Sequence, residues 1–184
     1  ACWGRNVYGQ LGDGTEFDKT TPVAVKTKPG GGALTGVQAI AAGGYHTCAL
    51  KTDGSVACWG RNLNGQLGDG TKNSKAPYGK TTPVAVKAKP GGGALTGVKA
   101  VAAGQSHTCA LKTNGAVACW GDNRNHQLGD GTWGSKATKT TPVAVKAQQG
   151  SGTLTGVEAI TARYNHTCAL KTDGSVACWG NNQD

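Results

Sequence analysis

The stretch His46-Thr-Cys-Ala-Leu-Lys-Thr-Asp-Gly-Ser-Val-Ala-Cys-Trp-Gly60 decides the fold of this chain. Two runs with strand character flank the turn sequence Thr52-Asp53-Gly54, so the stretch predicts a β-hairpin. Closely similar stretches recur at 107–121 and 166–180, and Ala-Cys-Trp-Gly also opens the chain. The tryptophans of the four copies lie 56, 61 and 59 residues apart. This period indicates a repeat array in which each unit buries its apolar surface against its neighbours.

The units differ in length at one place only. After each Gly-Asp-Gly-Thr come four residues in the first unit (16–19), nine in the second (72–80) and seven in the third (133–139). Only an exposed loop accepts such changes while its flanks keep their alignment.

Composition favours a globular chain without a membrane span. Of its 184 residues 37% are apolar, and no apolar run approaches the roughly 18 residues that cross a bilayer. The 31 glycines recur at fixed positions, which is typical of tight turns rather than of a flexible tract. The chain has no Met, so we expect a processed product or an excerpt of a longer protein.

Six of the seven cysteines form three pairs, each ten residues apart. This spacing matches no tetrahedral zinc pattern. The turn at 52–54 sets Lys51 against Ser55 and Cys48 opposite Cys58, and opposed residues lie about 4.5 to 5.5 Å apart, within reach of a disulfide. We predict disulfides, with reduced core thiols as the alternative, for Cys48 and Cys58, Cys109 and Cys119, and Cys168 and Cys178.

Oxidised pairs predict a secreted, periplasmic or cell-surface protein. Cys2 has no such neighbour, because the strand that should face it would lie upstream of Ala1. Its partner is therefore expected in missing sequence or in another molecule.

Four runs with strand character occur in each unit; in the first they are Pro22–Lys26, Val37–Ala42, His46–Lys51 and Ser55–Trp59. Four antiparallel strands repeated in line predict an all-β fold, a β-propeller of four-stranded blades. The alanine-rich second run suits an innermost strand, where there is little room. The four tryptophans are expected to fill the space between blades, with a binding surface as the alternative.

These patterns predict three blades and one orphan strand. The expected segments are 1–19 (orphan strand and first variable loop), 20–60 (blade 1), 61–121 (loop and blade 2) and 122–184 (loop, blade 3 and the start of the next repeat). Propellers need about four to eight blades, so this chain does not close a ring alone. We expect a larger ring, or an assembly in which Ala1–Trp3 has no full partner in its own chain and pairs with a neighbouring copy.

The segment Val56-Ala-Cys-Trp-Gly-Arg-Asn-Leu-Asn-Gly-Gln-Leu-Gly-Asp-Gly70, followed by Thr82-Pro-Val and by 98–111, resembles the regulator of chromosome condensation repeat, in a bacterial branch with Cys at these positions. The resemblance covers essentially the whole chain and implies a six- or seven-bladed propeller. It also implies very different functions, since the eukaryotic namesake is a nucleotide-exchange factor for a small GTPase and a bacterial relative is a secreted β-lactamase inhibitor. No segment here matches the wedge on which exchange depends.

Residues with catalytic chemistry recur in register but without partners. His46, His107 and His166 precede the paired cysteines, and no unit adds a nucleophile and an orienting carboxylate, so we expect structural rings bonded to backbone. His126 is expected at the loop surface. Asp13, Asp69 and Asp130 could suggest calcium, but each turn holds one carboxylate, so turn capping is the preferred interpretation. We therefore predict no enzyme, no metal and no cofactor.

Candidate binding residues are those that differ between units. Each variable loop pairs an aromatic residue with lysine: Phe17, Tyr78 with Lys75, and Trp133 with Lys136. They predict a shared binding rim, or else aromatics that fold back on their own loops. Arg163 occupies the position that Gly43 and Gly104 have in the other units. Its side chain either points into a face of the propeller, where it could contact a ligand, or has a role only in the local turn.

The net charge of +9 makes acidic partners plausible, but lysines in exposed turns also serve solubility. We expect a protein or glycan ligand rather than nucleic acid. The sequence thus predicts a non-enzymatic extracellular interaction module that binds a protein or glycan through its loops; in one version, copies also assemble into a fibre or coat through the N-terminal strand and Cys2. The alternatives are a secreted inhibitor of a hydrolase and, less favoured, an exchange factor.

Overall fold

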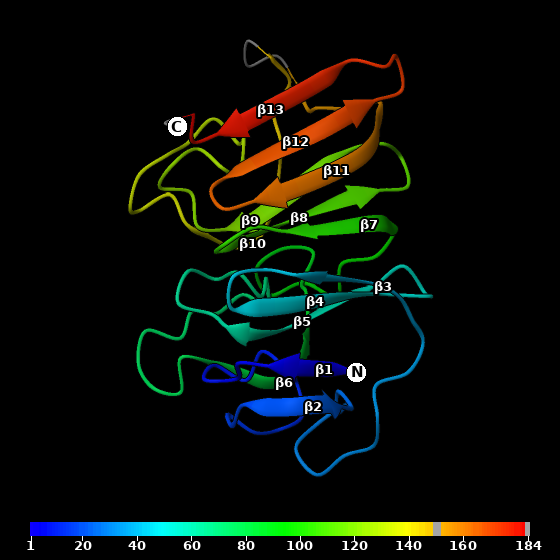
Figure 1. The fold of residues 1–184 in the computed structure, drawn as a ribbon. Helices are drawn as coiled ribbons and strands as arrows, with labels where there is room; N and C mark the ends of the chain where they lie inside the picture. The colour runs from blue at the N-terminus through cyan, green and yellow to red at the C-terminus, as the bar shows by residue number, and fades with distance from the viewer. Residues whose placement is uncertain (149–151, 183–184) are drawn as a thin grey trace.

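A computed structural model of the chain describes residues 1–148 and 152–182. Its regular structure consists of β-strands that run in stacked layers from the N-terminus to the C-terminus (Figure 1). The strands are β1 (Cys2–Gly4), β2 (Lys19–Val23), β3 (Val37–Ala42), β4 (His46–Lys51), β5 (Val56–Arg61), β6 (Gly79–Ala85), β7 (Val98–Ala103), β8 (His107–Lys112), β9 (Val117–Gly121), β10 (Lys139–Ala144), β11 (Val157–Arg163), β12 (His166–Lys171) and β13 (Val176–Gly180). No helix in the described part of the chain has the length and apolar character needed to cross a membrane.

The strands form four antiparallel sheets. The first sheet is β1-β2, the second β3-β4-β5-β6, the third β7-β8-β9-β10 and the fourth β11-β12-β13. The predicted four-stranded antiparallel blade is confirmed, complete in the second and third sheets.

The expected blade boundaries are wrong, because the outer strand of each blade comes from another part of the chain than expected. The run near Pro22 was expected to join the strands that follow it, in a blade at 20–60. Instead β2 pairs with β1, and β6 and β10 pair with β5 and β9, so each outer strand comes from across the variable loop. The reason is the chain direction: the variable loop returns the chain beside the strand it has just left. N-terminal β1 is thus not an orphan, since Cys2 lies opposite Val23.

Neighbouring sheets meet along their alanine-rich strands β3, β7 and β11, which contact one another in order (Figure 1). Backbone bonds continue this line, because Gly44 N–H donates to Gly104 O (3.2 Å) and Gln105 N–H donates to Tyr164 O (2.9 Å). These strands therefore form the inner edge of the stack, as their small side chains predicted.

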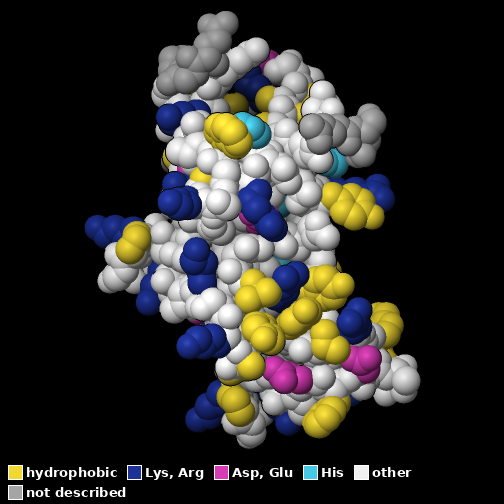
Figure 2. Space-filling model, turned by 90° about the vertical axis from the view of Figure 1, so that its left-hand side faces the viewer, with side chains coloured by type: hydrophobic (Ala, Val, Ile, Leu, Met, Phe, Trp, Pro, Cys, Tyr) yellow, Lys and Arg dark blue, Asp and Glu magenta, His cyan; other side chains and the backbone are white. Residues whose placement is uncertain are grey.

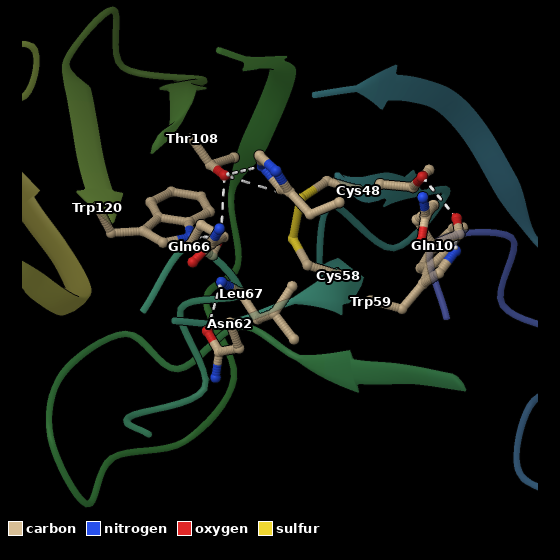
Figure 3. Close-up of a disulfide and its surroundings, with 11 residues drawn as sticks. Gln10, Cys48, Cys58, Trp59, Asn62, Gln66, Leu67, Thr108 and Trp120 are labelled. Atoms are coloured by element: carbon tan, nitrogen blue, oxygen red, sulfur yellow. Dashed lines mark hydrogen bonds between the residues drawn. A yellow bond between two sulfur atoms is a disulfide. The ribbon is translucent and has the colours of Figure 1, made fainter. Parts of the chain in front are cut away.

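The central hairpins have the predicted register. Cys48 lies opposite Cys58 and Leu50 opposite Val56, and Asp53 accepts the N–H of Ser55 within the turn. Disulfides join Cys48 to Cys58, Cys109 to Cys119 and Cys168 to Cys178, while Cys2 is a free thiol. Figure 3 shows the first bridge enclosed between sheets. Three disulfides are typical of proteins that fold in an oxidising compartment.

Three of the four tryptophans close seams between sheets, as was predicted for all four. Trp120 of the third sheet is fully buried in a cluster with apolar residues of the preceding unit, among them Leu67 and Val86. Its indole Nε1 donates to Gln66 O (2.9 Å), and Trp59 bonds the equivalent carbonyl of Gln10 (Figure 3). Trp179 bonds the carbonyl of Gln127 in the same way. Trp3 is 63% exposed.

Of the three seams between the four sheets, the two that join the second, third and fourth sheets, here called the first and second seams, each have a polar latch beside the disulfide. His46 Nε2 lies 2.9 Å from Thr108 Oγ1 of the next sheet, and that hydroxyl donates to Gln66 O (2.9 Å) (Figure 3). The hydroxyl proton is used on Gln66, so His46 Nε2–H is the donor to Thr108. The expected hydrogen bond between the histidine ring and the backbone is therefore wrong, because the ring bonds a threonine side chain instead.

The second seam repeats the latch with His107 Nε2 at 2.9 Å from Thr167 Oγ1, which donates to Gln127 O (3.1 Å). Burial lowers the pKa of His46 to about 3 and that of His107 to about 4. Both rings are therefore neutral structural groups at neutral pH.

The Gly-Asp-Gly loops are held by an asparagine at the start of each loop. Asn62 Nδ2 donates to Asp69 Oδ1 and to Thr71 O, while its Oδ1 accepts Leu67 N–H. Asp69 Oδ1 also accepts the N–H and the hydroxyl of Thr71. The aspartate is thus a turn acceptor, as the preferred interpretation held, and the loop places Leu67 in the seam.

Candidate binding face

One end of the strands carries all the length variation between units and many of their substitutions. We call it the turn face: the turns 43–46, 104–107 and 163–166, with segments 5–8, 15–19, 61–64, 72–79, 122–126 and 132–138. They meet at one end because β3, β5, β7, β9, β11 and β13 all finish there (Figure 1). Figure 2 looks onto this end and shows Lys and Arg spread over it, with hydrophobic side chains in clusters between them.

The residues expected on the rim lie on this face. Phe17, Tyr78 and Trp133 are 75%, 45% and 68% exposed, and Lys75 and Lys136 are exposed beside the latter two. Each aromatic belongs to the loop of a different unit, so the three are spread along the stack.

Trp133 shows the alternative behaviour of folding onto its own unit. Its ring stacks on His126, with centroids 5.3 Å apart at 27°. His126 takes the left-handed conformation (φ 62°) that glycine takes at the same position of the other units. The stack gives this aromatic a fixed orientation while leaving most of it accessible.

The three inner turns surround a hollow of about 350 Å³, lined by 42–45, 103–105 and 162–164. Arg163 lies here with its guanidinium 5.4 Å from the ring centroid of Tyr164. Glycine is needed in the other two turns, since a Cβ on Gly43 would lie 2.3 Å from the ring of His46 and one on Gly104 would lie 2.1 Å from that of His107. In the third unit Arg163 takes the place of this glycine. The histidine that follows it, His166, is only partly buried, whereas His46 and His107 are buried.

A second cluster of arginine and tyrosine lies beside this hollow. The guanidinium of Arg61 is 5.4 Å from the ring centroid of Tyr8 and 5.7 Å from that of Tyr45, and Arg5 is 5.6 Å from that of Tyr45. The two rings meet edge to face at 5.3 Å. Backbone structure holds the cluster, because Arg61 N–H donates to Tyr45 O (2.8 Å).

The equivalent position of the third unit is built differently. Asp122 stands where Arg5 and Arg61 stand, and it forms an ion pair with Arg124 at 2.8 Å. The side-chain bond from Asp122 raises the pKa of Arg124. One arginine of the turn face is thus neutralised by its own unit.

The turn face has little in the way of reactive or metal-binding groups. Among the described residues, no three His, Cys, Asp or Glu side chains gather closely enough to hold a metal ion. The carboxylate of Asp13 is occupied by Thr15 and Lys19; burial alone would raise its pKa, but these partners lower it overall. The groups that point outward are mainly cations and aromatic rings, with the exposed carboxylates of Glu16 and Asp18 beside Phe17.

Comparison with known proteins agrees with the repeat architecture. The regulator of chromosome condensation (RCC1) repeat matches residues 2–50, 53–111 and 114–170. The chain belongs to the RCC1 repeat family. A second description of the same repeat matches 37–66, 98–127 and 157–184, so the RCC1 pattern covers most of the chain.

Relatives share the repeats over part of their length. The chain is 34% identical over 182 residues to the probable E3 ubiquitin-protein ligase HERC6 of Homo sapiens, covering 97% of this chain and 16% of that protein. It is 36% identical over 132 residues to the ultraviolet-B receptor UVR8 of Arabidopsis thaliana, covering 70% and 26%. The chain thus spans about a quarter or less of these relatives.

Solved RCC1-type structures have the same fold. The crystal structure of Prp20p from Saccharomyces cerevisiae superimposes with a TM-score of 0.64 at 22% identity, covering 99% of this chain and 40% of that one. Human WBSCR16 gives a TM-score of 0.65 at 21% identity, covering 95% and 40%. The chain therefore has the fold of these structures and spans about 40% of their length.

Sequence reasoning found the loop aromatics and Arg163 but missed the arginine and tyrosine cluster. Its members come from three separate segments, 5–8, 45 and 61, and only the fold brings them together. The available signal was divergence, because Tyr45 stands where the other units have Ser106 and Asn165.

Proposed function

We propose that this chain is a non-enzymatic binding module that recognises another protein through its turn face. The carrying observation is a division within the repeats: seam residues recur with the same contacts, while the loops that vary in length, with their aromatic residues, lie at one end. Phe17, Tyr78 and Trp133 supply apolar area there, and arginines supply oriented charge. Aromatic residues and arginine are the types that most often carry binding energy at interfaces.

The disulfides support a place outside the reducing cytosol, so we propose a secreted, periplasmic or surface protein of the bacterial, cysteine-containing branch. Related folds are known in complex with proteins: one crystal structure holds yeast RCC1 (Prp20) bound to Kap60. Inhibition of a secreted hydrolase is one form of the proposed activity, in which the turn face covers an active site. A glycan ligand remains the second chemical class.

The test compares two sets of matched variants. One carries F17A, Y78A and W133A on the turn face; the control carries T52A, T113A and T172A, three exposed residues of the hairpins at the opposite end. Both are tested with the wild type against a panel of purified secreted hydrolases and an array of neutral and anionic glycans. We expect a protein ligand to be lost by the turn-face variant alone. Equal binding by that variant, or loss in the control only, overturns the proposal.

A second function, self-assembly, is favoured by the N-terminal sheet. Cys2 is a half-buried free thiol at the position that carries a bridge in Cys58, Cys119 and Cys178. Strand β1 pairs with β2 on one edge, and among the described residues no strand pairs with its other edge. We propose that a strand of another copy adds there. Oligomers that collapse on reduction, and that are absent in C2S, would support assembly; a monomer under all conditions would exclude it.

A further inference from the structure

We infer that the turn face takes an acidic peptide segment, whose carboxylates are bound by Arg5, Arg61 and Arg163; this rests on the proposed function. Within the parts of the chain that the structure describes, none of these three arginines forms an ion pair. All are exposed or half-buried at one end of the molecule.

The arginines are held by tyrosines rather than by acids. Arg5 and Arg61 both lie within 6 Å of the Tyr45 ring centroid, and Arg163 lies over Tyr164 in the same way. A ring face attracts a cation but neutralises none of its charge. Two guanidiniums therefore share one ring with their charges uncompensated, and a carboxylate between them would relieve the repulsion.

Arg61 adds an unused donor. Its Nε is buried and has no hydrogen-bond partner among the described residues. Guanidinium groups bind carboxylates through parallel N–H donors in a fixed plane, and the stacked rings hold that plane in place. Rigid donors lose little conformational freedom on binding, which favours a specific contact over diffuse attraction.

The two clusters are close enough to serve one ligand. Tyr45 lines the hollow that also contains Arg163, Tyr164 and Gln105. It also lines a neighbouring hollow of about 560 Å³ that contains Arg5. A peptide lying across the inner turns would pass from one arginine cluster to the other, with Tyr45 beneath it.

The same geometry favours a peptide over nucleic acid. Single-stranded nucleic acids stack their bases on free aromatic faces. Here the faces of Tyr8, Tyr45 and Tyr164 are each approached by a guanidinium. The groups left for a ligand are the oriented guanidinium charges and the apolar edges of the tyrosine rings. A peptide with acidic side chains and apolar neighbouring residues complements both.

The experiment titrates the full chain with a fluorescent hexaglutamate peptide, using hexaglutamine and a sulfated oligosaccharide as comparison probes. We expect hexaglutamate to bind and hexaglutamine not to bind. R163Q and the double variant R5Q/R61Q should each weaken hexaglutamate binding by about tenfold or more, as expected for a charge-assisted hydrogen bond. The control R124Q removes an arginine of the same face that Asp122 already neutralises, and should change the affinity less than about twofold.

One further variant separates folding and specificity from charge. R61K keeps the cation without the planar fork, so it should fold as the wild type does and still bind more weakly. Equal losses in R124Q and R163Q would show a merely electrostatic attraction and overturn the inference, as would tighter, arginine-dependent binding of the sulfated oligosaccharide.

The two experiments together distinguish failure of this inference from failure of the proposed function. A panel ligand lost by F17A/Y78A/W133A, together with no hexaglutamate binding, would leave the binding module standing and remove only the acidic ligand. If no panel ligand depends on the turn face, both fail.

Discussion

The seams between sheets and the turn face are built from the same units but follow opposite rules. In the first and second seams a histidine bonds a threonine at 2.9 Å, and the threonine hydroxyl bonds a glutamine carbonyl. On the turn face, one position holds Gly44, Gln105 and Tyr164 in turn. A seam residue is enclosed by two units, so any change must fit both, whereas a turn residue meets its own unit and solvent. Stability and recognition are thereby placed in separate residues.

The largest expected contrast is between two tryptophans. Trp120→Ala removes a fully buried indole from the first seam and should lower the free energy of unfolding by about 3 to 5 kcal/mol. Trp133→Ala, on the turn face at 68% exposure, should change it by less than about 0.5 kcal/mol. Denaturant titration of both variants measures the difference. Similar losses would show that the loops are part of the folding core.

Acid should destabilise the seams. The pKa values of His46 and His107 are lower in the folded protein than the value of about 6.5 that histidine has in the unfolded chain. Below about pH 6.5 the unfolded chain therefore binds more protons than the folded protein does. Stability is complete above that pH and falls as pH drops toward the folded-state values.

Between pH 7 and 5 we expect a loss of roughly 2 kcal/mol for each histidine. Thermal melts at stepped pH measure the loss. Imidazole NMR signals of the two rings that titrate near pH 6.5 in the folded protein would contradict it.

Removing a bridge should cost less than removing the indole. The double variant C109A/C119A frees a ten-residue loop and should lower the free energy of unfolding by about 2 to 3 kcal/mol. C2S is the matched control, because its thiol is already free, and should leave stability unchanged. A chain whose denaturation midpoint is the same with and without reductant would show that packing alone holds the hairpins.

The smallest effect on stability is expected on the turn face itself. The triple variant F17A/Y78A/W133A should unfold within about 0.5 kcal/mol of the wild type, because Phe17 and Trp133 are largely solvated and Tyr78 is 45% exposed. Its circular dichroism and melting curve are the measurement. A large loss would move these residues from recognition to scaffold.

The features predicted best are those set by neighbours in sequence. The turn at Asp53 brings Cys48 opposite Cys58 because a tight turn determines the register of a hairpin, so the disulfides were predictable. The outer strands were assigned to the wrong blade, since they pair across a variable loop whose path no local pattern specifies. The latch partner of His46 was missed because Thr108 lies 62 residues away.

By itself the sequence determined the repeat, the hairpins, the bridged cysteines and the presence of variable aromatic loops, because these follow from local spacing and turn chemistry. Only the tertiary structure decided which strands share a sheet, how the seams are latched, and that Arg5, Tyr8, Tyr45 and Arg61 form one cluster. Those relations join segments distant along the chain, and they arise when stacked sheets bring equivalent ends of successive units side by side.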